Sequence, residues 1–345
     1  MTKVRERGEE VRRYILANVE KHSVGIARVT ADRFDISRQA VNKHLQKLVG
    51  ERALKQHGKT RSRSYQLAPL AHWRKTFSLA KTLAEDRIWR EDVVSSLGQM
   101  PQNVLEIWHY GFTEIFNNAI DHSEGSLIAV NFRKTASTTQ IEIHDNGVGI
   151  FKKIQMALGL IDERHAVLEL AKGKLTTDPA RHTGEGIFFA SRMFDDFEIL
   201  SGDIHFSHQF DKKEDWILER DKFSSGTAVW MKLNNHTART TKKVFDKFTS
   251  GDDYGFTKTV VPVKLTQYGD ENLVSRSQAK RLLARVDRFE TVILDFRGVE
   301  SVGQAFADEI FRVFAVQHPN VALLELNANS TVKRMISRAR ASAKL

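Results

Sequence analysis

The residues best suited to chemistry lie in two glycine-rich segments. In the first, Asp145 ends an alternating strand and is followed by Gly147 and Gly149. A carboxylate at this point can accept a hydrogen bond from an exocyclic amine, and glycines let the backbone approach a planar ring. In the second, Gly184 and Gly186 precede a short helix, whose N-terminal amides and dipole favour a phosphate group. Neither segment has the spacing of a Walker loop or of a dinucleotide-binding loop.

A predicted helix upstream adds polar side chains on one face. Glu114, Asn118 and His122 are four residues apart, so they project from the same side of a helix that we expect from about Val104 to His122. An Asn carbonyl, together with phosphate oxygens and water, suits Mg²⁺. A Glu one turn away can orient or deprotonate an attacking water or hydroxyl group. The alternative is an ordinary solvated helix face.

The order of these segments resembles the ATPase domain of the gyrase, chaperone, histidine kinase and mismatch-repair (GHKL) superfamily. Residues 114–122 (EIFNNAIDH) are similar to its N box, in the form closest to that of the anti-sigma serine kinases. Residues 145–150 (DNGVGI) and 184–187 (GEGI) match its two glycine boxes, and residues 225–227 (SGT) match its closing Gly-Thr. The resemblance implies a two-layer α+β domain over residues 104–237 that binds ATP and Mg²⁺.

The resemblance also implies a role for each matching residue. Asn118 would ligate Mg²⁺, and Glu114 would be the catalytic base. Asp145 would bind the adenine amine, with Thr227 supporting it through water. His122 would bond a phosphate or merely end its helix.

The segment between the glycine boxes, residues 151–183, would be the lid over the phosphates. Its cations Lys172, Lys174 and Arg181 would reach phosphate oxygens or remain solvated. The second box has Ile187 where Leu is usual, and Glu185 adds a negative charge beside the phosphates. These departures bear on turnover rather than on binding.

The first 68 residues carry a concentrated positive charge. Residues 1–68 contain sixteen Lys and Arg against seven Asp and Glu, within a chain whose net charge is +10. Such asymmetry is typical of a module that binds a polyanion, most often nucleic acid. Three short amphipathic helices, the third capped by Ser37, and a hairpin around a basic loop are expected here.

This order of elements resembles a winged helix-turn-helix, which implies DNA as a partner. Polar side chains early in the third helix would reach base edges in the major groove, and basic side chains of the wing would contact phosphate or the minor groove. The alternative is a winged helix used for protein contacts. The candidate DNA-binding residues are Ser37, Arg38, Gln39, Lys43, Arg61 and Arg63.

Two further regions flank the nucleotide segments. Residues 69–103 are expected to form a helical linker, with apolar residues at helical spacing over 71–99, that serves dimerisation or packs on its neighbouring domain. Residues 252–342 alternate strand and helix, which indicates a small α/β domain. They are similar to STAS-like domains related to anti-sigma-factor antagonists, which implies a regulatory protein partner. Gly303 and Gln304 stand where phosphorylated antagonists have Asp-Ser, so a phosphoswitch is not expected.

Composition excludes several classes of function. The chain has no cysteine, which rules out disulfides, thiolate metal sites and a cysteine nucleophile. No stretch approaches the roughly 20 apolar residues of a membrane helix, and the charged N-terminus lacks a secretory signal. We therefore expect a cytoplasmic protein with no membrane segment. The resemblance to the GHKL superfamily and the role of a regulator favour a homodimer.

The hypothesis that unites these features is a multidomain regulator with a winged helix, a two-layer α+β ATP-binding domain and a small α/β domain. ATP would act as a switch that modulates DNA binding. The alternatives are an anti-sigma-type kinase acting on Ser or Thr of a partner, and an ATPase linked to DNA. The sequence leaves open whether ATP is hydrolysed, transferred or only bound, and therefore whether the chain is an enzyme.

Overall fold

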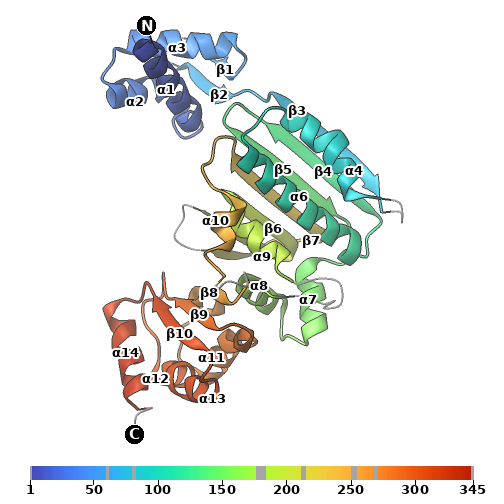
Figure 1. Ribbon diagram of the computed structural model, residues 1–345, viewed down its shortest axis with the longest axis vertical. Coiled ribbons are helices and arrows are strands. Elements are labelled where there is room, and N and C mark those ends of the chain that lie inside the picture. Colours follow the sequence, from blue (N-terminus) through green and yellow to red (C-terminus); the bar gives the residue numbers. More distant parts are fainter. Residues whose placement is uncertain are drawn as a thin grey trace.

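The elements of the chain fall into three successive groups (Figure 1). One hydrophobic core lies within the N-terminal group, and a second runs continuously through the other two. No helix among the described residues is long and apolar enough to cross a bilayer. The computed structural model describes residues 2–59, 62–79, 83–175, 184–210, 215–249, 255–267 and 271–342.

Three helices and an antiparallel hairpin form the N-terminal group. The side chain of Ser37 accepts a hydrogen bond from the backbone N of Ala40 and so caps the third helix, as expected. Val41, Leu45 and Leu48 of that helix are buried, which leaves its opposite face to solvent. The elements are α1 (Thr2–Asn18), α2 (Ile26–Phe34), α3 (Arg38–Gly50), β1 (Leu54–His57) and β2 (Ser64–Leu67).

A five-stranded antiparallel sheet, in the order β3-β4-β5-β7-β6, forms the middle group. Helices α6 and α9 pack on one face of it (Figure 1). Along β5, alternate side chains are buried, so one face of the sheet meets these helices. The strands are β3 (Ala71–Ser78), β4 (Leu127–Lys134), β5 (Thr138–Asp145), β6 (Asp196–Gln209) and β7 (Trp216–Asn234). The helices are α4 (Glu85–Ile88), η2 (Trp89–Val94), α5 (Ser95–Leu97), α6 (Gln102–His122), α7 (Ile150–Leu158), α8 (Glu163–Lys172), α9 (Gly186–Met193) and α10 (Thr241–Phe245).

The prediction of a helix over residues 71–99 is wrong for its first part. Ala71–Ser78 is strand β3, which pairs with β4 along its whole length. Trp73 and Phe77 are four residues apart, a spacing that fits a helix but also a strand with alternate residues on one side. The edge of β4 decides between the two, because pairing satisfies backbone groups and the Trp73 ring stacks on Phe132 at 5.3 Å. Helix begins only with α4.

A three-stranded parallel sheet, in the order β10-β9-β8, forms the C-terminal group. Helices alternate with its strands, as the sequence predicts for a small α/β unit. The elements are β8 (Lys258–Pro262), η3 (Val263–Thr266), α11 (Arg276–Leu283), η4 (Val286–Arg288), β9 (Thr291–Asp295), α12 (Gln304–Asp308), η5 (Glu309–Phe314), α13 (Ala315–Gln317), β10 (Ala322–Leu326) and α14 (Ser330–Ala341).

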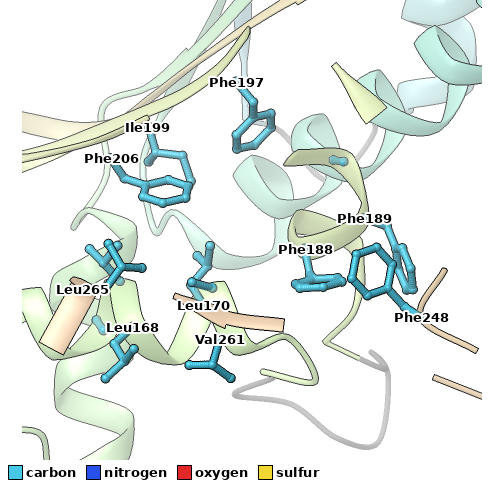
Figure 2. Close-up of a cluster of buried hydrophobic side chains, with 14 of the residues drawn as sticks. Leu168, Leu170, Phe188, Phe189, Phe197, Ile199, Phe206, Phe248, Val261 and Leu265 are labelled. Carbon is cyan, nitrogen blue, oxygen red and sulfur yellow. The ribbon is translucent and has the colours of Figure 1, made fainter. Parts of the chain in front are cut away.

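Buried side chains join the antiparallel and parallel sheets into one core. Figure 2 shows Phe188 and Phe189 of α9 beside Phe248, and leucines of α8 near Val261 of β8. The ring of Phe188 lies 4.9 Å from that of Phe248 and 4.8 Å from that of Phe256. A hydrophobic contact of this kind opposes independent motion of the two groups.

Candidate functional site

A cavity of about 310 Å³ lies between α6, the end of β5, helices α7 and α8, and the start of α9. Most of its lining is apolar, and a few polar side chains converge on it, as is usual for a small-molecule site. The apolar residues include Ile115, Ile143, Ile150, Ile154, Leu170, Leu175 and Val229. The polar side chains include Glu114, Asn118, His122, Asp145, Lys153 and Thr227, and the glycines are Gly149, Gly184 and Gly186.

Asp145 is the buried carboxylate of this cavity, with 5% of its surface exposed. Its Oδ1 accepts hydrogen bonds from the backbone N of Gly147 at 2.9 Å and of Thr227 at 3.2 Å. Its Oδ2 accepts no hydrogen bond within the described part of the chain. Burial raises the pKa of Asp145, and the two backbone hydrogen bonds oppose that shift. One carboxylate oxygen is thus held in place while the other is left for a donor from a ligand.

Tight backbone contacts around Asp145 explain two of the glycines. A Cβ at Gly147 would lie 1.9 Å from a carbonyl oxygen at the end of α6, and a Cβ at Gly226 would lie 1.9 Å from the carbonyl oxygen of Asp145. Gly226 also has a φ of +74°, which side chains disfavour. Thr227 Oγ1 accepts a hydrogen bond from the backbone N of Ile150 at 2.9 Å. The backbone of Gly147 therefore holds the Asp145 carboxylate in place, and the Thr227 side chain connects β7 to the start of α7 by a hydrogen bond.

One face of α6 supplies three of the polar side chains. Glu114, Asn118 and His122 all line the cavity, as their four-residue spacing permits. An amide oxygen such as that of Asn118 can ligate Mg²⁺, but only with oxygens from phosphate and water, since no group of three His, Asp or Glu side chains gathers among the described residues.

Lys153 is a lining residue that the sequence reasoning missed. Its Nζ donates to the carbonyl oxygen of His122 at 2.7 Å and pairs with Glu124 at the same distance. It lies on α7, three residues after Ile150 and directly before Ile154, and both isoleucines also line the cavity. That helical spacing is the signal in the sequence from which it could have been found.

The start of α9 brings the second glycine segment to the cavity. The carboxylate of Glu114 lies directly against Gly186. Burial raises the pKa of Tyr110, and the carboxylates of Glu114 and Glu185 add to the shift, so the phenol stays protonated. Burial also raises the pKa of Glu185, against the opposing effect of Lys174. The backbone amides at the start of α9 thus favour a bound anion, whereas the carboxylates of Glu114 and Glu185 repel it. A bound cation would offset this repulsion between negative charges.

The structure places Lys172 away from the cavity. The residue is 1% exposed, and its Nζ pairs with Glu169 at 2.8 Å. It also donates to the carbonyl oxygens of Arg281 at 3.0 Å and Ala284 at 2.8 Å. Burial lowers the pKa of Lys172, and Glu169 opposes the shift. Lys172 therefore joins α8 to the C-terminal group instead of reaching toward the cavity.

Lys174 also contacts the C-terminal group rather than the cavity. Its Nζ donates to the carbonyl oxygen of Arg288 at 3.1 Å and lies 4.8 Å from the centre of the Phe289 ring. In return, Arg288 donates to the carbonyl oxygen of Lys174. Arg181, the third cation expected over the phosphates, lies outside the described residues.

The candidate DNA-binding residues lie on the exposed side of α3 and near β2. Ser37, Arg38, Gln39 and Lys43 are all exposed, at the N-cap and in the first two turns of α3. Arg63, just before β2, is partly buried, and Arg61 lies outside the described residues. Four polar side chains are thus presented together at the start of one helix.

Comparison with known families identifies the C-terminal group only. The family described as STAS-like domain of unknown function (DUF4325) matches residues 278–333, which run from α11 into α14. No curated protein matches the chain. The C-terminal region is therefore STAS-like, and the function of the other two groups must be argued from their geometry.

Proposed function

We propose that the chain is an ATP-dependent regulator of the GHKL type, in which Mg-ATP binds in the cavity beside α6 and controls DNA binding by the N-terminal group. The observation that carries this proposal is convergence. Glu114 and Asn118, Asp145, Gly186 and Thr227 come from four separate segments, yet they line one cavity. Each segment by itself is compatible with an ordinary turn or helix face. The meeting of all four around an apolar cavity is instead typical of a small-molecule site.

Adenine recognition rests on Asp145. Its Oδ2 is available to accept a hydrogen bond from the exocyclic amine, while Oδ1 is held by backbone amides. The apolar lining from Ile143, Ile150 and Val229 suits an aromatic ring. A base that carries a carbonyl oxygen in place of the amine would face the carboxylate with an acceptor, so ATP is favoured over inosine or guanosine nucleotides.

Phosphate binding rests on Asn118, Lys153 and the start of α9, which also line the cavity. The Asn118 amide oxygen would ligate Mg²⁺, and the start of α9 and Lys153 would lie near phosphate oxygens. Bound Mg²⁺ supplies charge neutralisation for the phosphates and for the carboxylates of Glu114 and Glu185. Glu114 would accept a proton from an attacking water or hydroxyl group.

The link to DNA binding rests on strand β3. Only residues 68–70 separate β2 of the N-terminal group from β3 of the sheet. Within this connection, the backbone N of Leu70 donates a hydrogen bond to the carbonyl oxygen of Lys134 at 2.7 Å. Lys232 of β7 also lies 4.0 Å from Glu20 at the end of α1. A change in the sheet that holds Asp145 would therefore alter how the positively charged N-terminal group is presented.

Nucleotide binding and hydrolysis by point variants test the site. Asn118→Ala should weaken binding of Mg-ATP, measured by calorimetry, because a metal ligand is lost. Glu114→Ala should keep binding and lose release of phosphate. Asn117→Ala, one position away on α6 and outside the cavity lining, is the matched control. Unchanged binding in Asn118→Ala would refute the site, and a stable phosphoprotein formed from labelled ATP would favour the kinase alternative.

Gel-shift titration tests the coupling to DNA. Fragments selected from a random pool would be titrated with the full chain in ATP, in ADP and without nucleotide, and we expect different affinities. Arg38→Ala/Lys43→Ala should weaken binding about a hundredfold, because each lost contact to base or phosphate is worth about 1–3 kcal/mol. Lys242→Ala/Lys243→Ala, on exposed positions of α10, controls for total charge. Identical DNA affinity in the three nucleotide states would refute the coupling.

A further inference from the structure

A second cavity, of about 330 Å³, lies between the middle and C-terminal groups. It shares no lining residue with the first cavity. The two are joined by α9, which begins with Gly186 at the first cavity and carries Arg192 to the second. The second cavity is thus a separate place for a ligand, one helix away from the proposed nucleotide site.

The second cavity opens at the carboxyl ends of the parallel strands. Pro262, Asp295 and Leu326 are the last residues of β8, β9 and β10, they are paired in register, and all three line it. Ligands of open α/β sheets bind outside the carboxyl ends of the strands. Apolar side chains of Val244 and Phe248 cover the other side. The site therefore has the apolar lining that a small organic molecule needs.

A buried ion-pair cluster forms one wall of this cavity. The carboxylate of Asp215 lies 3.4 Å from Arg192 Nη1 and also contacts His208 Nδ1. The three side chains are only 7%, 13% and 15% exposed, respectively. Buried ion pairs add little to stability, because desolvation offsets the attraction, but they hold a charged group in one position. Burial and the nearby Arg192 lower the pKa of His208, and Asp215 opposes the shift.

The charges of the described lining residues do not balance. Four cationic side chains, from Arg192, Lys247, Lys264 and Arg297, face two carboxylates. The carboxylates pair with the arginines, since Asp295 lies 3.9 Å from Arg297. Within the described residues, neither lysine has a carboxylate within 4 Å. Lys264 Nζ donates to the carbonyl oxygen of Gly298, and Lys247 Nζ lies 5.8 Å from the centre of the Phe210 ring.

We propose that this cavity binds a small organic phosphate, with a dianionic phosphate monoester between Lys247 and Lys264 and an apolar body against Val244, Phe248 and Leu326. Two exposed ammonium groups that have no carboxylate partner among the described residues match the two charges of a phosphate monoester. The apolar wall accounts for the rest of the molecule. This site does not depend on nucleotide binding in the first cavity.

Calorimetric titration of phenyl phosphate into the full chain tests the site. We expect one binding event per chain. Lys247→Met/Lys264→Met should weaken it at least about tenfold, because hydrogen bonds to charged groups are worth about 1.5–3 kcal/mol each. Lys247→Arg/Lys264→Arg should keep the affinity within about threefold, since the charge and the donors remain. Both lysines are exposed, so circular dichroism should show wild-type folding in every variant.

Three controls distinguish binding in the second cavity from binding elsewhere on the chain. Lys242→Met/Lys243→Met removes the same charge from α10, at positions that do not line the cavity, and should leave the affinity unchanged. Asn118→Ala, in the first cavity, should also leave it unchanged. Inorganic phosphate should bind at least about tenfold more weakly, because it lacks an apolar body to bury. Equal affinity in the two Lys→Met double variants, loss of binding in Asn118→Ala, or absence of any saturable binding would overturn the proposal.

Discussion

The carboxylate of Glu114 lies so close to Gly186 that a Cβ at position 186 would come within 1.8 Å of Glu114 Oε2. Helices α6 and α9 therefore meet at a point that admits no side chain from α9. Because the atom in the way is the end of a Glu side chain, and not backbone, an added methyl group would move the carboxylate before it moved the helix. The glycine thus sets the position of the proposed catalytic base.

Gly186→Ala should consequently impair catalysis more than folding. We expect ATP turnover to fall about a hundredfold, the usual contribution of a positioned general base, with a melting temperature near that of the wild type. Phosphate release and thermal unfolding measure the two effects. Gly50→Ala is the matched control, since a Cβ there meets nothing within 4 Å. Equal turnover in the two variants would contradict the role of Gly186.

Asp145→Asn should change which nucleotide binds best. The Asn oxygen would still accept the hydrogen bonds from Gly147 and Thr227, which turns the amide NH₂ toward the ligand. That donor faces the donor of the adenine amine, so we expect ATP affinity to fall about tenfold to a hundredfold. Inosine triphosphate carries an oxygen in place of the adenine amine, so its affinity should fall less than that of ATP, or rise. Calorimetry with both nucleotides measures these affinities, and Asp196→Asn, outside the cavity, serves as the control. An equal loss of affinity for both nucleotides in Asp145→Asn would argue against base recognition by Asp145.

Lys172→Met should lower stability without lowering the ATP affinity of the folded chain. The substitution leaves the buried Glu169 with Arg285, at 3.5 Å, as its remaining ion-pair partner among the described residues, and removes the donor for two carbonyl oxygens. Breaking a buried ion pair costs about 3 kcal/mol or more in the free energy of unfolding. Urea unfolding and calorimetry check both parts, with exposed Lys152→Met as control. Weaker ATP binding with normal stability would instead place Lys172 at the phosphates.

Acid should destabilise the chain through Asp215. Burial raises the pKa of Asp215, but Arg192 and His208 outweigh this effect and lower the pKa from its ordinary value of 3.8 to about 2. A carboxyl group whose pKa is lowered by folding stabilises the protein above its unfolded pKa, and this contribution is lost as the pH falls through the folded pKa. The shift corresponds to about 2 kcal/mol.

The difference in unfolding free energy between the wild type and Asp215→Asn should therefore shrink by about 2 kcal/mol between about pH 5 and pH 2. Urea titrations at a series of pH values measure it. Asp203→Asn, at an exposed position of β6, should show a constant difference from the wild type. A constant difference for Asp215→Asn as well would show that its pKa is not lowered by folding.

Local patterns in the sequence determined most elements and the faces on which site residues lie. Glu114, Asn118 and His122 share one side of α6 because the helix repeat alone places residues four apart together. The alternation along β5 likewise ends at Asp145, and Ser37 caps α3. These features depend on backbone geometry within a few residues, so the order of residues suffices to predict them.

Contacts between distant parts of the chain decided the rest. Trp73 and Phe77 suit a helix or a strand equally, and only the edge of β4 made their segment a strand. Lys172 and Lys174 look like free cations beside a glycine loop, but carbonyl oxygens more than a hundred residues away bind them. The second cavity exists only where the ends of β8, β9 and β10 meet the middle group. The energy of a charge or a strand edge depends on the partners that folding brings to it, and those partners leave no mark in the neighbouring sequence.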